Sequence, residues 1–170
     1  RDSTCLDTSG IMFPKKHTRT DQISEREISL TGISENKASD RMEKIEQLMS
    51  VTDLVMLDIK HINDEEHQKL TGQSNSNILA FARYLDSIGK PVWIRHVVVP
   101  GITFDEKELT ELGLFLKTLH NVEKLEVLPY HSMGKVKYDN LGMDYVLKDT
   151  PQLTKAEAKE AGNMIRAAMK

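Results

Sequence analysis

Short apolar runs recur along this chain, and three of them run directly into polar residues. They lie at Ser3–Asp7, Leu54–Ile59, Val92–Val99 and Lys124–Leu128. Near-continuous apolar runs of this length, without strict alternation, are typical of parallel strands that are buried on both faces. The pattern therefore predicts four parallel strands.

Helical patterns separate the strands. Arg41–Met49 carries an apolar stripe on one side. Asn63 can cap a short helix that ends near Leu70, just before a glycine. A third pattern, over Asn77–Ile88, also ends at a glycine. Each pattern predicts one helix.

Two later helices are predicted from their first turns. Thr103 with Glu106 fits a capping box and predicts a helix to about Leu119. Thr154 with Glu157 repeats the signature and predicts a last helix to about Ala168.

The order of elements indicates the fold class. Strands that alternate with helices form βαβ units with right-handed crossovers, which build a parallel sheet. Four strands are too few to close a barrel. We predict an α/β fold, either an open arc of a partial β/α barrel or a small doubly wound sheet, with residues 1–170 as a single domain.

Two segments lack this periodicity. Pro14–Asp40 is polar and rich in Ser, Thr, Lys and Glu, which predicts a flexible insertion or long loop. Within it, Ile23–Leu30 could form a short helix or hairpin. Tyr138–Pro151 is predicted to be a second loop.

Composition excludes several classes of function. Of the 170 residues, 39% are hydrophobic and 29% charged, and the net charge of −3 gives no basic footprint for nucleic acid or a membrane surface. No apolar run approaches the roughly 18 residues of a membrane span, and no signal peptide is visible. With Cys5 as the single cysteine, a cytoplasmic location is expected, and the chain cannot hold an iron–sulfur cluster or a structural zinc ion unaided.

Candidate chemistry lies at the carboxyl ends of the predicted strands, where ligands bind in parallel β/α folds. Asp7 and Thr8 follow the first strand, although Asp-Thr-Ser-Gly also suits an ordinary turn. Asp58 and Lys60 share one face of the second strand. They could bind a zwitterion or form a structural ion pair with each other.

The last two strands add cationic groups. Arg95 interrupts an apolar run, so it is expected to face the barrel mouth and bind a carboxylate or a carbonyl. His96 falls on the opposite face and is expected to pack under a helix. His131 follows the fourth strand and could donate to a ligand or lie on the surface. Together a strand-end carboxylate, Lys60, Arg95 and His131 predict one rim that holds a charged small ligand.

Five stretches, in order, carry a family resemblance. They are TCLDTSG (Thr4–Gly10), VTDLVMLDIKHINDEEHQKLTG (Val51–Gly72), NILAFARYL (Asn77–Leu85), VWIRHVVVPGIT (Val92–Thr103) and NVEKLEVLPYHSMGKVKY (Asn121–Tyr138). The sequence closely resembles pyruvate formate-lyase activating enzymes, which are radical S-adenosylmethionine proteins with a partial (β/α)6 barrel. The resemblance covers about Ser3–Gly10 and Glu43–Lys170.

The resemblance implies roles for individual residues. It implies a monovalent cation site, for Na⁺ or K⁺, made by Asp7, Thr8, Met56 and Asp58. It also implies S-adenosylmethionine contacts at Asp58, Lys60 and His131, and a role for Arg95 in placing the glycine-bearing peptide of the target enzyme.

The reaction that the resemblance implies is reductive cleavage of S-adenosylmethionine by a [4Fe–4S] cluster. The resulting 5′-deoxyadenosyl radical removes hydrogen from a glycine of pyruvate formate-lyase. The implied partners are pyruvate formate-lyase and a flavodoxin-type electron donor.

Two motifs of that family do not occur in this chain, namely the CxxxCxxC cluster motif and a glycine-rich motif. We therefore expect a C-terminal fragment that neither holds the cluster nor turns over by itself. We also expect it to self-associate through an exposed sheet edge at Ser3–Asp7.

Three alternatives remain open at this point. The parent protein could activate another glycyl radical enzyme. The fold could instead belong to an unrelated barrel lyase that uses Lys60 as a Schiff-base lysine. The chain could also be a non-catalytic binding or regulatory remnant.

Overall fold

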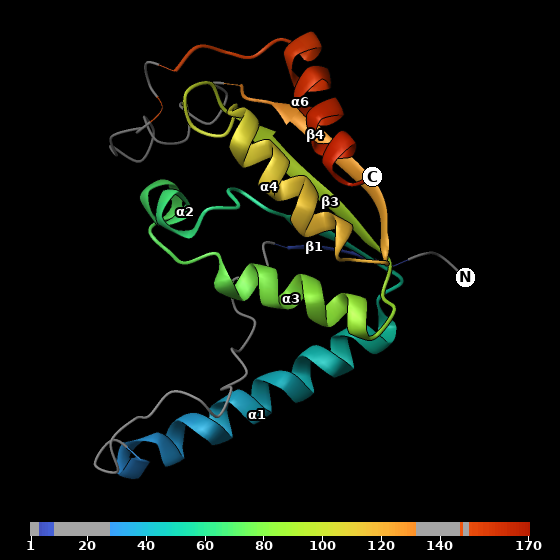
Figure 1. The fold of residues 1–170 in the computed structure, drawn as a ribbon. Coiled ribbons are helices and arrows are strands. Elements are labelled where there is room, and N and C mark those ends of the chain that lie inside the picture. The colour runs from blue at the N-terminus through green and yellow to red at the C-terminus, as the bar shows by residue number, and fades with distance from the viewer. Residues whose placement is uncertain (1–3, 9–27, 132–146, 148–149) are drawn as a thin grey trace.

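The computed structural model of the chain describes residues 4–8, 28–131, 147 and 150–170. Strands and helices alternate through most of these residues, and their order places helices between successive strands (Figure 1). The elements are β1 (Cys5–Thr8), α1 (Ile28–Val51), β2 (Leu54–Asp58), α2 (Asp64–Thr71), α3 (Ser76–Ser87), β3 (Val92–Val98), α4 (Glu106–Lys117), β4 (Val122–Pro129) and α6 (Lys155–Ala168).

The four strands form one parallel sheet in the order β1-β2-β3-β4. This confirms the predicted partial β/α architecture. The register sets residues from neighbouring strands side by side in rows. Asp7 lies beside Met56, and Asp58 lies beside Arg95.

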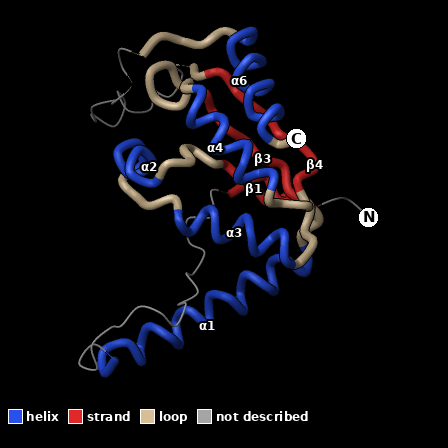
Figure 2. The backbone as a smooth tube through the Cα atoms, viewed as in Figure 1, coloured by secondary structure: helices blue, strands red, loops and turns tan. Residues whose placement is uncertain are grey.

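Alternation along the strands gives the sheet two unlike faces. In β2, Val55 and Leu57 are fully buried, whereas Met56 and Asp58 are only half-buried. The buried face packs against the helices, and Figure 2 shows α3 and α4 in front of the sheet with α6 beside β4. The half-buried face, which we call the open face, carries the polar side chains at the strand ends.

The ends of α2 are set by local sequence, as predicted. The side chain of Asn63 accepts a hydrogen bond from the backbone N–H of Glu66 at 3.2 Å. Gly72 ends the helix with a positive φ of 75°, a conformation that favours glycine because it has no Cβ. The capping box of Thr154 and Glu157 at the start of α6 is also confirmed.

The start of α4 differs from the prediction. Asp105, not Thr103, is the N-cap residue, and its carboxylate accepts from the backbone N–H groups of Lys107 and Glu108. Thr103 is buried in the preceding turn, where its hydroxyl accepts from Val99 N–H and donates to the Val97 carbonyl. A hydroxyl that is engaged in this turn cannot cap the helix.

The extent of α1 corrects a second expectation. The helix begins at Ile28, so residues 28–40 are helical although they were predicted to belong to a flexible insertion or loop. Residues 28–40 show no apolar stripe in the sequence. Helical hydrogen bonding can nevertheless extend outward from a packed segment, because propagation costs much less than nucleation. Residues 14–27 of the insertion and most of the loop at 138–151 lie outside the described residues.

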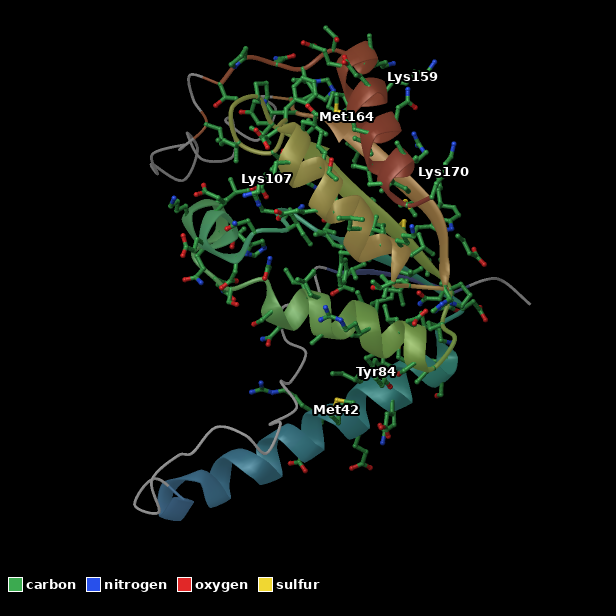
Figure 3. All side chains as sticks on the ribbon, in the orientation of Figure 1. Met42, Tyr84, Lys107, Lys159, Met164 and Lys170 are labelled. Atoms are coloured by element: carbon green, nitrogen blue, oxygen red, sulfur yellow. The ribbon has the colours of Figure 1, made fainter. Side chains whose placement is uncertain are left out.

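The second half of α1 packs against α3. Met42 and Tyr84 are half-buried against the core, and Figure 3 shows them between the two helices. Among the described residues, no helix is long and apolar enough to cross a membrane.

Candidate functional site

Three strands bring four charged side chains together on the open face. Arg95, from β3, donates through Nε to Asp58 Oδ1 at 2.9 Å and through Nη2 to Asp7 Oδ1. Lys60 donates through Nζ to the other oxygen of Asp58 at 2.9 Å. Asp58 therefore accepts from two cations, and Arg95 bridges two carboxylates. We call Asp7, Asp58, Lys60 and Arg95 the rim network.

Burial makes this network more than a surface ion pair. The side chains of Asp58 and Arg95 are 21% and 20% exposed, whereas that of Asp7 is 54% exposed. Burial lowers the pKa of the Arg95 guanidinium, but the hydrogen bonds and charges of Asp7 and Asp58 outweigh burial and raise the pKa above its ordinary value. Arg95 therefore carries a permanent positive charge, and the two carboxylates and two cations of the network balance in charge.

The loop that follows Lys60 is tied down by buried polar groups. His61 is 1% exposed, and its Nε2 lies 3.3 Å from the Ile102 carbonyl in the β3–α4 loop. The Asn75 side chain donates to the carbonyls of His61 and Ile62 at 3.1 and 2.6 Å. These contacts fix the backbone from which the Lys60 side chain extends.

His96 plays the structural part expected of it. It is 3% exposed on the helix-covered face, and its Nδ1 lies 2.7 Å from the Ile59 carbonyl, which it can reach as a donor. Burial lowers its pKa from 6.5 to about 4, so the imidazole is neutral at physiological pH. Arg95, its neighbour in the chain, points to the opposite face.

Three other predicted site residues have looser relations to the rim network. Met56 lies half-buried on the open face beside Asp7. Thr8 is in register with Leu57, so strand alternation directs its side chain to the other face of the sheet. His131 is exposed two residues after β4, and within the described residues no ion pair or hydrogen bond joins it to the network.

The prediction from sequence missed a second polar group on the same face. Glu126, from β4, is in register with Arg95, and its carboxylate pairs with Lys124 Nζ at 3.0 Å. The Lys124 ammonium lies 4.4 Å from the centre of the Trp93 ring, at cation–π distance. A signal was present, because Lys124 and Glu126 are two residues apart and therefore share a face.

The donor set fits some of the implied groups. Carboxylate oxygens from Asp7 and Asp58 suit a hard cation such as Na⁺ or K⁺, and the Arg95 guanidinium already places positive charge between them. Met56 could serve such an ion only through its backbone carbonyl, because thioethers prefer soft metals. Asp58 and Lys60 also suit the ammonium and carboxylate of a methionyl group.

An iron–sulfur cluster does not fit the residues of this chain. Cys5 is the only cysteine in the sequence, and it is exposed at the first strand. Among the described residues, no group of three or more His, Cys, Asp or Glu side chains could hold a metal ion.

The sequence is closely similar to two bacterial proteins. The pyruvate formate-lyase-activating enzyme of Streptococcus mutans is 52% identical over 124 residues, which is 73% of this chain and 47% of that enzyme. The enzyme of the same name from Staphylococcus epidermidis is 50% identical over 116 residues, covering 68% of this chain and 46% of that enzyme. No protein-family model matches the chain.

The fold also has a solved counterpart. The crystal structure of a domain of the pyruvate-formate lyase-activating enzyme from Bacteroides vulgatus superposes with a TM-score of 0.60 at 20% identity, covering 74% of this chain and 69% of that chain. Similarity at that identity supports the fold alone. The chain spans about half the length of the curated relatives it matches. The chain therefore belongs to the pyruvate formate-lyase-activating enzyme family and corresponds to about half of such an enzyme.

Proposed function

We propose that this chain supplies the ligand-binding rim of an enzyme that activates pyruvate formate-lyase by removing a hydrogen atom from one of its glycines. The observation that carries the proposal is the 52% identity to an activating enzyme over 124 residues. The charged residues expected from the resemblance also gather at the ends of adjacent strands.

The rim residues have distinct proposed roles. S-adenosylmethionine, when bound, supplies the group that takes hydrogen from the glycine. Asp58 holds its ammonium, Lys60 pairs with its carboxylate, and His131 contacts it from the end of β4. The role of this chain is to orient the ligand, because a reacting group that is held in place avoids much of the entropic cost of the encounter.

A monovalent cation would sit beside the methionyl carboxylate. Asp7 and Asp58 supply oxygen ligands, and Thr8 and Met56 complete the proposed set through their backbone carbonyls, because the Thr8 side chain is directed to the other face of the sheet. Arg95 contacts the glycine-bearing peptide. Its planar guanidinium suits carbonyl and carboxylate groups of such a peptide. A flavodoxin-type protein is the proposed electron donor.

The test uses a chimera of the Streptococcus mutans enzyme in which the segment that aligns with this chain is replaced by the residues of this chain. The reconstituted chimera is incubated with reductant, S-adenosylmethionine and pyruvate formate-lyase, and electron paramagnetic resonance measures the glycyl radical. We expect a radical signal that Asp58→Asn reduces at least tenfold. Glu65→Gln, an exposed carboxylate on α2, is the matched control and should leave the signal unchanged.

The outcomes separate the proposal from its alternatives. A chimera that binds its cluster but forms no radical on pyruvate formate-lyase would contradict the proposed target. A radical on a different glycyl radical enzyme in the same assay would redirect the proposal to that substrate. Equal signals from Asp58→Asn and Glu65→Gln would contradict the role of the rim.

A further inference from the structure

Arg95 lies between carboxylates on both of its neighbouring strands. In the register of the sheet, Asp58 of β2 stands on one side of it and Glu126 of β4 on the other. The guanidinium leans toward β2 and β1, where it contacts Asp58 and Asp7. Glu126 pairs instead with Lys124.

The register of the sheet places a second possible partner, Glu126, within reach of the Arg95 side chain. Adjacent strands lie about 4.8 Å apart, so the Arg95 backbone is about equally far from the strands of Asp58 and Glu126. An arginine side chain is long enough to reach either neighbour. Because Arg95 is 20% exposed, it is stable only with a carboxylate or another acceptor beside it.

The charge balance of the rim network implies that a cation bound between Asp7 and Asp58 must displace the Arg95 guanidinium. Two carboxylates, Asp7 and Asp58, already face two cations, Arg95 and Lys60. A further cation between Asp7 and Asp58 would meet the guanidinium of Arg95 at the same oxygens. Like charges in a partly buried site repel strongly, so the two cations cannot occupy the position together.

We propose that Arg95 is a movable counter-ion that neutralises Asp7 and Asp58 until a ligand cation displaces it toward Glu126. The inference rests on the proposed function, which names the cation. It adds that Glu126 is a positioning residue, because it receives the guanidinium and holds it on the open face. Arg95 then presents its remaining donors to the peptide only after the cation is bound.

The experiment measures Na⁺ binding to the 170-residue chain itself. The broadening of the ²³Na resonance is titrated with NaCl in choline chloride at constant ionic strength. The chains compared are the wild type, Arg95→Gln, Glu126→Gln, the double variant and Arg41→Gln. Arg41 is an exposed arginine on α1, so its variant controls for the loss of one positive charge.

If Na⁺ displaces the Arg95 guanidinium, the Na⁺ affinities of the variants follow a definite order. Arg95→Gln should bind Na⁺ about tenfold more tightly than the wild type, because a charge-assisted hydrogen-bond partner no longer competes. Arg41→Gln should match the wild type. Glu126→Gln should bind Na⁺ several-fold more weakly, because the displaced guanidinium loses its acceptor.

The double variant separates this mechanism from simple attraction between Glu126 and the cation. If Glu126 acts through Arg95, Glu126→Gln has no effect once Arg95 is glutamine. An equal effect in both backgrounds would overturn the positioning role of Glu126. Equal affinities for Arg95→Gln and Arg41→Gln would overturn the displacement itself. Neither result depends on the radical assay, so a failure of the proposed function remains distinguishable.

Discussion

At the scale of single residues, Asp58 is the centre of the rim network. Of the two aspartates in the rim network, it is the one that accepts from both Lys60 and Arg95, and it is mostly buried. Asp7 shares Arg95 but is half exposed to solvent. The two aspartates therefore form a natural pair for comparison.

Asp58→Asn should lower the free energy of unfolding by about 2 to 4 kcal/mol, because two cations lose a partly buried partner. Asp7→Asn should cost less than about 1 kcal/mol, because water solvates that end of the network. Urea unfolding followed by circular dichroism measures both values. Equal losses would show that Asp58 does not organise the network.

His96 makes the free energy of unfolding depend on pH. Its pKa is lowered by burial to about 4 from 6.5, so the folded chain binds the proton less tightly than the unfolded chain does. Its contribution to stability is therefore complete above pH 6.5 and is lost as the pH falls toward 4. Between pH 7.5 and pH 5 the loss from this one residue should be about 2 kcal/mol.

The matched variant is His96→Asn, which keeps a side-chain N–H near the Ile59 carbonyl but does not titrate. Urea unfolding at pH 7.5 and at pH 5 compares the two chains. Carboxylates with lowered pKa values, such as Asp64 and Asp86, also favour unfolding as the pH falls, but both chains share them. The same pH dependence in both chains would refute the assignment to His96.

The sequence was enough to predict most of the rim residues but not their partners, and the reason is physical. Asp58, Lys60 and Arg95 stand out because charges inside apolar strands need partners. The partner of Arg95 could not be chosen from sequence, because it depends on register across β1, β2 and β3. Glu126 was missed because its strand is partly exposed, where a charge is unremarkable.

At the scale of elements, the sequence predicted the strands and most helices but not every boundary. Periodicity and the caps at Asn63 and Thr154 are local signals, and both caps are confirmed. The predicted helix cap at Thr103 was wrong because the Thr103 hydroxyl forms hydrogen bonds within the turn before α4, and these bonds compete with capping. The early part of α1 was missed because residues 28–40 carry no apolar stripe.

The packing of α4 on α6 depends on one glycine. A Cβ on Gly113 would lie 2.5 Å from the Ile165 carbonyl oxygen and 2.6 Å from the Ala168 Cβ, and neither atom can move without the α6 backbone. A Cβ on Gly162 would mainly meet the flexible end of Arg166, at 2.9 Å.

Gly113→Ala should therefore destabilise the chain by about 1 to 3 kcal/mol, since overpacking outweighs the gain in helix propensity. Gly162→Ala should be neutral or stabilising by up to about 1 kcal/mol. Thermal unfolding of the two variants tests the pair. A Gly113→Ala chain as stable as Gly162→Ala would contradict the close approach of α4 and α6.

At the scale of the whole molecule, β1 is an edge strand, because among the described residues it pairs with β2 alone. Edge strands present unpaired backbone groups that can pair with another chain. The Thr4 carbonyl bonds β2, so alternation directs the backbone groups of Cys5 away from β2 and toward the free edge.

We expect the 170-residue chain to self-associate through this edge as its concentration rises. Cys5→Pro removes the outward N–H and should weaken association while leaving the pairing of β1 with β2 in place. Light scattering over a concentration series compares the two chains, and Cys5→Ala controls for loss of the thiol. A monomeric wild-type chain at every concentration would count against the open edge.

If the strand ends of this chain hold S-adenosylmethionine, the affinity of the chimera for that ligand depends on the rim residues. Calorimetric titration compares Lys60→Met with Lys159→Met, which removes an exposed ammonium from α6 (Figure 3). We expect Lys60→Met to weaken binding at least tenfold, because a charge-assisted contact to the carboxylate is lost, and Lys159→Met to leave the affinity unchanged. Equal affinities for the two variants would show that the Lys60 end of the rim does not bind S-adenosylmethionine.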